Sequence, residues 1–182
     1  MGLELWAAVI GLALVLPAVF VYNRLVSDRN LVRQGYADID VQLKRRADLV
    51  PQLVEAVRAY AAYENALLIA VTEARASALA SHGPAARFGA ERSLGEGLQR
   101  LVLLAESYPQ LKADASFRDL SARLVEIEDH LQYARRFYNG AVQQYLTRIQ
   151  SFPDLVIARL FRFKPMPFFE TDDREAPAKV SF

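Results

Sequence analysis

Two histidines are the side chains in this sequence best suited to acid–base or metal chemistry. His82 lies in a loop that contains glycine and proline, where we expect a solvated side chain rather than a catalytic one. In a helical bundle, a di-metal site needs a glutamate three residues before a histidine, so that both side chains reach one metal ion. The residue three positions before His130 is Ile127, so this motif is missing.

Other catalytic motifs are missing as well. The sequence has no phosphate-binding glycine loop, no exposed nucleophilic serine turn and no helical His-Glu-x-x-His pattern. Cysteine is absent, which excludes a thiolate nucleophile, a disulfide framework and a zinc site with sulfur ligands. We therefore predict that the protein is not an enzyme and that it holds no cofactor and no metal ion.

Four polar residues at or near the apolar faces of predicted helices make up the candidate site. They are Arg46, Glu64, Arg136 and Asn139. Buried polar groups in long bundles most often fix the register of the helices through hydrogen bonds. The alternative is a polar groove that receives a partner. Non-additive stability losses from Arg46→Met and Glu64→Gln would indicate a direct pair, whereas additive losses would argue against one.

Length and charge limit the classes of protein. The chain has 182 residues, a formal net charge of +1 and 53% apolar residues. This length suffices for one sizeable core together with an anchor. The balanced charge argues against a nucleic-acid binder driven by bulk electrostatics. We therefore expect one helical domain with a membrane anchor and no nucleic-acid partner.

The N-terminal segment has the length and composition of a membrane span. Residues 5–22 contain no charged side chain, and as a helix they would be about 27 Å long, close to the thickness of the hydrocarbon core. We predict a single-pass transmembrane anchor over residues 1–23. A cleaved signal peptide is the rival interpretation, but Glu4 stands where cations are expected, and Leu16 stands where a small residue is needed.

The cations next to this segment predict its orientation. Arg24, Arg29 and Arg33 follow the uncharged residues, whereas only the terminal amine and Glu4 precede them. The positive-inside rule therefore favours a cytoplasmic location for the rest of the chain, with the opposite side as the alternative.

Residues 24–153 are predicted to form a bundle of four long antiparallel helices, which makes the fold class all-α. The last helix has the clearest pattern, with Asp114 as its N-cap and Pro153 at its end. Its apolar residues alternate steps of three and four, as in a helix packed along one seam. They are Phe117, Leu120, Leu124, Ile127, Leu131, Ala134, Tyr138, Ala141 and Tyr145.

The first helix carries a similar seam up to a proline. Its seam residues are Val32, Tyr36, Ile39, Leu43, Arg46 and Val50, whereas Arg45 points away. Pro51 disfavours helical geometry at the residue before it, and Asp48 can accept hydrogen bonds from the amides of a new helix. We predict a hinge at Asp48 and Pro51 that reverses the chain into a second helix over residues 51–80. The alternative is a continuous helix that is kinked at Pro51.

The segment after the bundle, residues 154–170, interleaves aromatic and basic side chains. Such a segment suits a lipid interface, with rings in the acyl boundary and cations at the headgroups. The candidate interfacial residues are Arg159, Phe161, Arg162, Phe163, Lys164, Phe168 and Phe169. The alternative is that these phenylalanines cover the open end of the bundle. Residues 171–182 are polar without periodicity and are predicted to be disordered.

Four segments of the chain carry a specific family pattern. They are "IDVQLKRRADLVPQLVEAVRAYAAYE", "AESYPQLKADASFRDL", "ARRFYNGAV" and "FPDLVIARLFRF". These segments resemble the LemA family of bacterial membrane-anchored helical proteins. The resemblance implies an N-terminal helix in the inner membrane of a bacterium and a domain of long antiparallel helices, and it supplies no catalytic residues. The chain departs from the family pattern at Tyr36, Tyr63 and Leu146.

Two functions fit these expectations. The first is an adaptor, in which a membrane-anchored bundle presents one face to another membrane or envelope protein. The second is a scaffold, in which copies of the chain pack laterally as a homo-oligomer at the membrane. A scaffold needs an apolar stripe left over after the core is filled, and only the pairs Leu53/Val54 and Leu67/Leu68 suggest one. We predict the adaptor, with the scaffold as the alternative.

Overall fold

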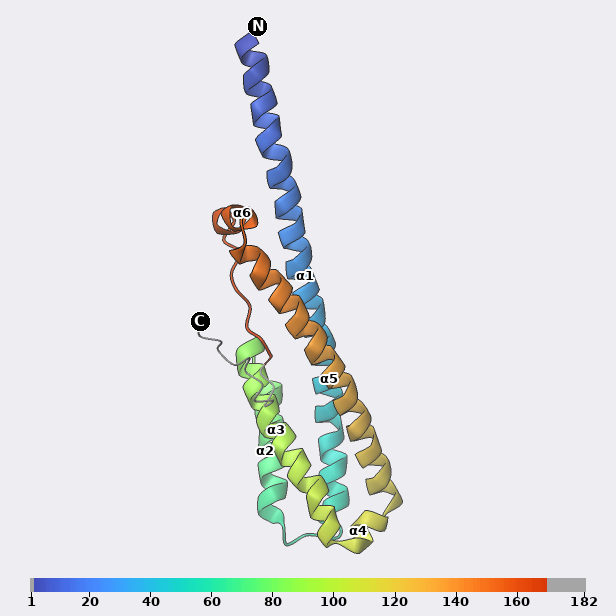
Figure 1. Cartoon of the computed structure of the whole chain (residues 1–182). Coiled ribbons are helices and arrows are strands. Elements are labelled where there is room, and N and C mark those ends of the chain that lie inside the picture. Colours follow the sequence, from blue (N-terminus) through green and yellow to red (C-terminus); the bar gives the residue numbers. More distant parts are fainter. Residues whose placement is uncertain (1, 170–182) are drawn as a thin grey trace, which may run out of the picture. The chain divides into compact units, whose positions relative to one another are not determined.

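The computed structural model describes residues 2–169, except for the side chains of residues 3–5, 7–11 and 14. Within this range the regular elements are helices, which confirms the all-α fold class (Figure 1). They are α1 Gly2–Arg58, α2 Asn65–Ala80, α3 Pro84–Leu104, the 3₁₀ helix η1 Ala105–Ser107, α4 Pro109–Ala113, α5 Ala115–Gln150 and α6 Asp154–Leu160. The predicted disordered end, residues 171–182, lies outside the described residues.

The chain divides into two compact units. Unit 1 consists of residues 1–43 and 128–167, and unit 2 consists of residues 44–127 and 168–182. The two longest helices, α1 and α5, each contribute one part to each unit.

Unit 2 contains the up-and-down helical arrangement. The end of α1, then α2, α3 and the start of α5 follow one another with short connections, and α2 lies beside α3 (Figure 1). Buried apolar side chains from all four segments form one core, as expected for helices that each bury one face. The largest contributions include Leu53 from α1, Leu68 from α2, Leu94 and Leu98 from α3, and Phe117 from α5.

Unit 1 is built on α1 and α5, which run antiparallel and approach closely. Gly35 of α1 is buried, and a Cβ atom at this position would lie only 3.0 Å from the Cα atom of Tyr138. A side chain at residue 35 would therefore force the two helices apart. The short helix α6 follows α5 after a turn and lies beside α1 in Figure 1.

The helix phases predicted from the spacing of apolar residues are confirmed. In α1, Val32, Ile39, Leu43, Arg46 and Val50 are buried and Tyr36 is half-buried. In α5, all nine predicted seam residues are buried or half-buried. The N-cap prediction is also confirmed, because the backbone N–H of Phe117 donates a hydrogen bond of 2.9 Å to the Asp114 carboxylate.

The predicted hinge at Asp48 and Pro51 is wrong. The helix α1 continues through both residues and ends only at Arg58, so the continuous-helix alternative holds and the reversal occurs at residues 59–64. Proline cannot donate the hydrogen bond that would satisfy the carbonyl oxygen four residues earlier, which belongs to Ala47. In unit 2 the Nε of Arg75 on α2 donates a hydrogen bond of 2.7 Å to this oxygen. The arginine thus replaces the missing backbone donor.

Substitution of Arg75 by methionine is expected to lower the free energy of unfolding by about 1 to 3 kcal/mol, the cost of leaving a buried acceptor without its donor. Thermal or urea unfolding of the chain would measure this loss. The control is the double variant Arg75→Met and Pro51→Ala, in which the backbone N–H of residue 51 can bond to the Ala47 oxygen again. If the proline change recovers none of the loss, Arg75 does not act by satisfying that carbonyl group.

Within the described part of the chain, no helix is both long enough and apolar enough to cross a membrane. The anchor over residues 1–23 therefore stays a prediction from the sequence.

Candidate functional site

A buried cluster of three charged residues joins α1 to α3 within unit 2. The Arg46 guanidinium donates a hydrogen bond of 2.7 Å to the Glu91 carboxylate and a second, of 3.0 Å, to the Glu91 backbone oxygen. On the other side, the Nε of Arg87 lies 3.4 Å from the second carboxylate oxygen of Glu91. Arg46 is 2% exposed and Glu91 is fully buried, so these charges depend on each other instead of on water.

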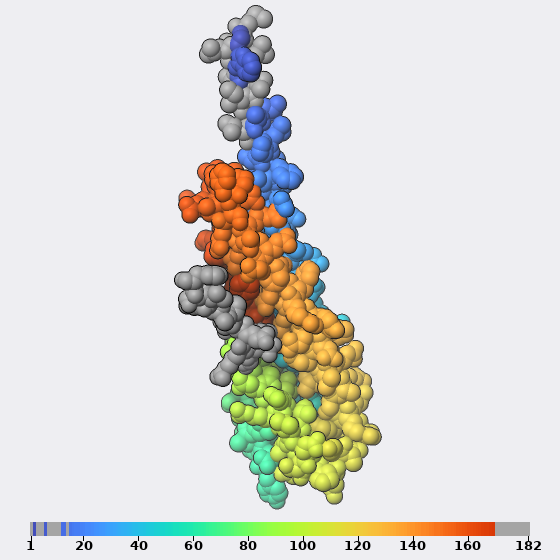
Figure 2. Space-filling view, viewed as in Figure 1, coloured from blue at the N-terminus to red at the C-terminus, as the bar shows by residue number. Residues whose placement is uncertain are grey.

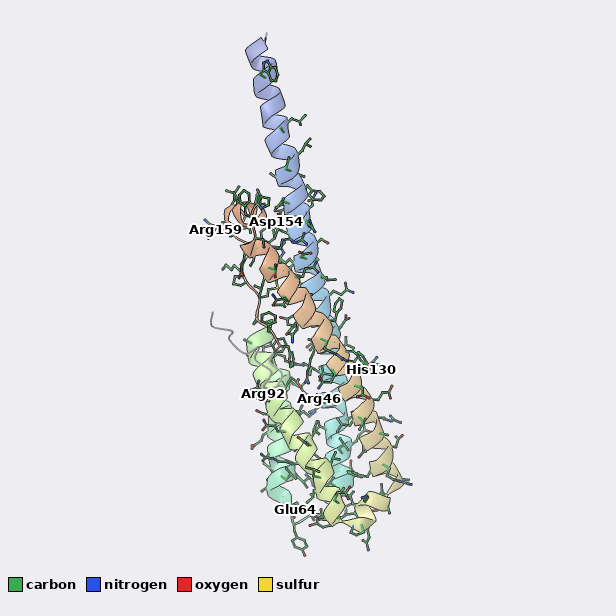
Figure 3. The ribbon with its side chains drawn as sticks, viewed as in Figure 1. Arg46, Glu64, Arg92, His130, Asp154 and Arg159 are labelled. Atoms are coloured by element: carbon green, nitrogen blue, oxygen red, sulfur yellow. The ribbon has the colours of Figure 1, made fainter. Side chains whose placement is uncertain are left out.

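The arginine on α3 also connects to α2. The Nη1 of Arg87 donates a hydrogen bond of 2.5 Å to the backbone oxygen of Ala78 in the last turn of α2. The same oxygen accepts a longer bond of 3.4 Å from the backbone N–H of Ser81, which caps α2, so Arg87 adds a second donor at the end of this helix. We call Arg46, Glu91 and Arg87 the charged triad. The triad connects three helices at one level along their length. Figure 3 shows Arg46 directed from α1 toward α3. These contacts connect α1, α2 and α3, and a role in fixing their register stays a prediction.

Glu64, whose direct pairing with Arg46 the sequence left open, lies elsewhere in unit 2. It is half-buried in the turn before α2, far from Arg46 in Figure 3, and accepts a hydrogen bond of 3.2 Å from the Tyr108 hydroxyl. A direct pair between Arg46 and Glu64 is therefore wrong. Burial and the nearby Glu64 carboxylate raise the pKa of Tyr108, so this hydroxyl stays a donor at neutral pH.

A second tyrosine–carboxylate contact lies at the same end of unit 2. The Tyr60 hydroxyl donates a hydrogen bond of 3.1 Å to Asp114. The backbone N–H of Phe117 and then this hydroxyl hold the pKa of the Asp114 carboxyl below its usual range, and the same contact raises the pKa of Tyr60. These two tyrosines connect the turn after α1 to the connection between α3 and α5.

The other two candidate residues lie on α5 in unit 1. Arg136 is exposed, and its guanidinium lies over the ring of Tyr133 at 4.7 Å from the ring centroid. The prediction that Arg136 belongs to a buried network is therefore wrong, because its position is on the outer side of the α5 seam. Asn139 is half-buried next to the buried Tyr138. The four candidates do not converge on one site.

A polar cluster that the sequence reading missed joins α1 to α5 in unit 1. Asp28 is 6% exposed, and its carboxylate lies 2.6 Å from the Nε of Arg148 and accepts a hydrogen bond of 3.0 Å from Gln144. A signal was present, because Asp28 falls four residues before Val32 on the α1 seam. Glu91 has the same signal, three residues before Leu94 on the α3 seam. Counting the seams further back would have found both carboxylates.

Two buried tyrosines of α5 hold the chain after α6 in place. Tyr145 donates a hydrogen bond of 2.9 Å to the backbone oxygen of Lys164, and Tyr138 donates one of 2.7 Å to that of Pro167. Seven residues of helix and three residues of extended chain both span about 10 Å, so the two hydroxyls match the two carbonyl groups. Burial, and to a smaller extent Tyr36, raises the pKa of Tyr138 to about 12, so the hydroxyl remains a donor.

The predicted interfacial residues fall into an inner and an outer set. Within unit 1, the Phe163 ring lies 5.9 Å from the Tyr22 ring and 5.0 Å from the Arg29 guanidinium. Within unit 2, Phe169 is 5% exposed and lies 4.0 Å from the Phe88 ring. The outer set is exposed and consists of Arg159, Phe161, Arg162, Lys164 and Phe168. Phe163 and Phe169 therefore pack against other side chains of their own units, and the outer set keeps its interfacial prediction.

Both histidines are exposed. His82 lies before α3. His130 lies on α5, where Figure 3 labels it. Among the described residues, no group of three histidine, aspartate or glutamate side chains could hold a metal ion.

Residues 35–182 match the sequence profile of the LemA family. The matched region includes the charged triad and the bonds of Tyr138 and Tyr145 to the chain after α6. The chain belongs to the LemA family. The matched region begins within α1 at residue 35 and covers all later helices and the residues after α6, so it confirms the resemblance carried by the four segments.

The relatives that are similar to this LemA-family chain include proteins named magnetosome protein MamQ. Magnetosome protein MamQ 2 and magnetosome protein MamQ 1 of Paramagnetospirillum magneticum are each 23% identical over 175 residues, which cover 82% of this chain. Magnetosome protein MamQ of Magnetospirillum gryphiswaldense is 22% identical over 174 residues, which cover 81% of this chain. The aligned region spans 64% of the length of each of these relatives.

Proposed function

We propose that this LemA-family protein is a non-enzymatic adaptor, anchored in a bacterial membrane by the uncharged residues 5–22, that presents one face of α5 to another membrane or envelope protein. The observation that carries the adaptor role is the outer face of α5 in unit 1. Tyr133 is 66% exposed, and Phe137, four residues later, is 43% exposed while part of its ring packs beside Gly35 of α1. Arg136 lies over the Tyr133 ring between them.

This combination of side chains suits a binding surface. Aromatic residues and arginine supply most of the affinity in protein interfaces, because they bury much area with little loss of conformational freedom. The alternative scaffold is disfavoured by the core of unit 2. Leu53, Val54 and Leu68 are buried and Leu67 is half-buried, so the stripe that lateral packing would need is already used inside the unit.

Photo-crosslinking in living cells tests the adaptor. A photoreactive amino acid would replace Tyr133, and a matched probe would replace Arg58, which is exposed at the end of α1. We expect an adduct with one other membrane or envelope protein from position 133, no such adduct from position 58, and loss of the adduct on Phe137→Glu. Adducts only between copies of this chain would favour the scaffold, and equal labelling from both positions would contradict a specific face.

A further inference from the structure

Four large apolar side chains are exposed on and beside α6 in unit 1. Their exposed fractions are 83% for Phe152, 56% for Val156, 70% for Leu160 and 54% for Phe161. The opposite side of this short helix packs inward, with Ala158 only 2% exposed. Leu155 and Ile157 are half-buried, so the exposed apolar side chains gather on the outer side of α6 and beside its ends, where they can contact something other than water.

The position of α6 beside the proposed anchor indicates that this contact is with the bilayer. The Phe161 ring lies 4.8 Å from the ring of Tyr22, the last residue of the uncharged segment. Figure 2 shows the side chains of α6, in orange, directly beside those of α1, in blue. On α1 itself Val19 and Phe20 are 51% and 66% exposed, so the apolar surface of α6 continues onto the proposed anchor. A surface at the end of a membrane span meets the interfacial layer of the bilayer.

Two arginines accompany these apolar side chains. Arg159 is exposed and extends from α6 on the side away from α1 (Figure 3), and Arg162 is exposed directly after the helix. Cations next to apolar side chains at a membrane surface attract anionic headgroups. Among the residues that the structure describes, no acidic side chain forms an ion pair with either arginine.

The backbone at Arg162 adds an independent argument. The N–H of Phe163 bonds to the oxygen of Ala158 and the N–H of Arg162 to that of Arg159, which is the Schellman arrangement that ends a helix. This arrangement places Arg162 at a φ of 55°, the left-handed region where glycine is usual. An arginine held in an unfavourable backbone conformation points to a role for its side chain.

We infer that the outer face of α6 is a second membrane contact, a foot that lies in the headgroup layer of an anionic lipid bilayer. The α6 foot consists of Phe152, Val156, Arg159, Leu160, Phe161 and Arg162. Its rings and aliphatic side chains enter the acyl boundary, and its two guanidinium groups bind lipid phosphates bidentately. The inference rests on the proposed anchor, since only an embedded segment over residues 5–22 brings α6 to this depth.

Depth-dependent quenching by brominated lipids tests the foot in the full chain. The sequence has one tryptophan, so Trp6→Phe provides a background for single reporters. The reporters would be Leu160→Trp on the foot, Phe20→Trp on the proposed anchor and Tyr133→Trp on the outer face of α5. The chain would be reconstituted into vesicles of brominated phosphatidylcholine with and without phosphatidylglycerol.

If the α6 foot contacts lipid, we expect strong quenching of tryptophan fluorescence at positions 20 and 160 and none at position 133. Quenching at position 160 should decrease clearly when phosphatidylglycerol is left out. Quenching at 20 but not at 160 overturns the foot and leaves the anchor standing. Absence of quenching at both positions overturns the anchor and the foot together. Equal quenching at 160 in both lipid mixtures overturns the assignment to anionic headgroups.

Two variants of Arg162 separate lipid binding from folding. Arg162→Gly removes the cation and relieves the left-handed backbone, so we expect the Tm to rise while quenching at position 160 falls. Arg162→Lys keeps the charge and the unfavourable φ, so we expect most of the quenching to remain and the Tm not to rise. If Arg162→Gly leaves quenching at position 160 unchanged, the cation has no part in lipid contact.

Discussion

Substitution of Glu91 by glutamine is expected to lower the free energy of unfolding by about 3 to 5 kcal/mol, because it leaves two arginines without their shared carboxylate in a buried place. Arg46 is 2% exposed and Arg87 is 7% exposed, so water cannot replace the lost charge. Urea unfolding of wild type and variant in the same detergent would measure the loss. A decrease below about 1 kcal/mol, the range of solvated surface pairs, would contradict the buried triad.

Replacement of the whole triad is the matched control. Buried ion pairs are costly to break and often cheap to replace, because apolar side chains carry no desolvation penalty. The triple variant Arg46→Met, Glu91→Leu and Arg87→Met should therefore recover most of the stability that Glu91→Gln loses. In double variants, Arg46→Met should be strongly non-additive with Glu91→Gln and additive with Glu64→Gln, since the Arg46 guanidinium bonds to Glu91, whereas Glu64 bonds to Tyr108.

Substitution of Leu131 by alanine is expected to cost about 2 to 5 kcal/mol of unfolding free energy, the range for a leucine that leaves a cavity in a packed interior. Leu131 is fully buried on the α5 seam of unit 1. Thermal unfolding followed by circular dichroism would measure the shift.

Two comparison sites on the predicted seams show whether burial sets this cost. Leu124 is half-buried, so Leu124→Ala should cost less than Leu131→Ala. Arg45 is exposed on α1, so Arg45→Ala should cost less than about 0.5 kcal/mol. Similar losses at Leu131 and Arg45 would mean that the α5 and α1 seams do not face the interior.

The N-terminal third of the chain shows how far spacing alone can go. Steps of three and four residues located the buried face of α1 and placed Arg46 on it, because a side chain's direction on a helix depends only on its position in the chain. Counting in the same steps back from Val32 on α1 and from Leu94 on α3 locates the two buried carboxylates, Asp28 and Glu91. Spacing could not say which charge meets which, since the partner of Arg46 lies 45 residues further along the chain.

The outer residues of α5 and α6 show a second limit. Aromatic and basic composition predicted that residues 154–170 would meet a surface, but not that Phe163 and Phe169 would pack inward while Phe161 stays exposed. That separation depends on Tyr138 and Tyr145, whose hydroxyls hold the backbone at Pro167 and Lys164. Arg136 shows the same limit. Its position near the α5 seam predicts burial, but the side chain is exposed, because a position near a seam does not determine the side on which its neighbours pack.

The sequence by itself determined the helical class, the buried faces of α1 and α5 and the cap at Asp114, all of which depend on residues within one or two turns of each other. Only the tertiary structure decided the path of the chain at Pro51. The local rules favoured a hinge there, because proline leaves the Ala47 carbonyl without a donor. Arg75, 28 residues from Ala47, supplies that donor from another helix, so α1 stays continuous and the first reversal moves to residues 59–64.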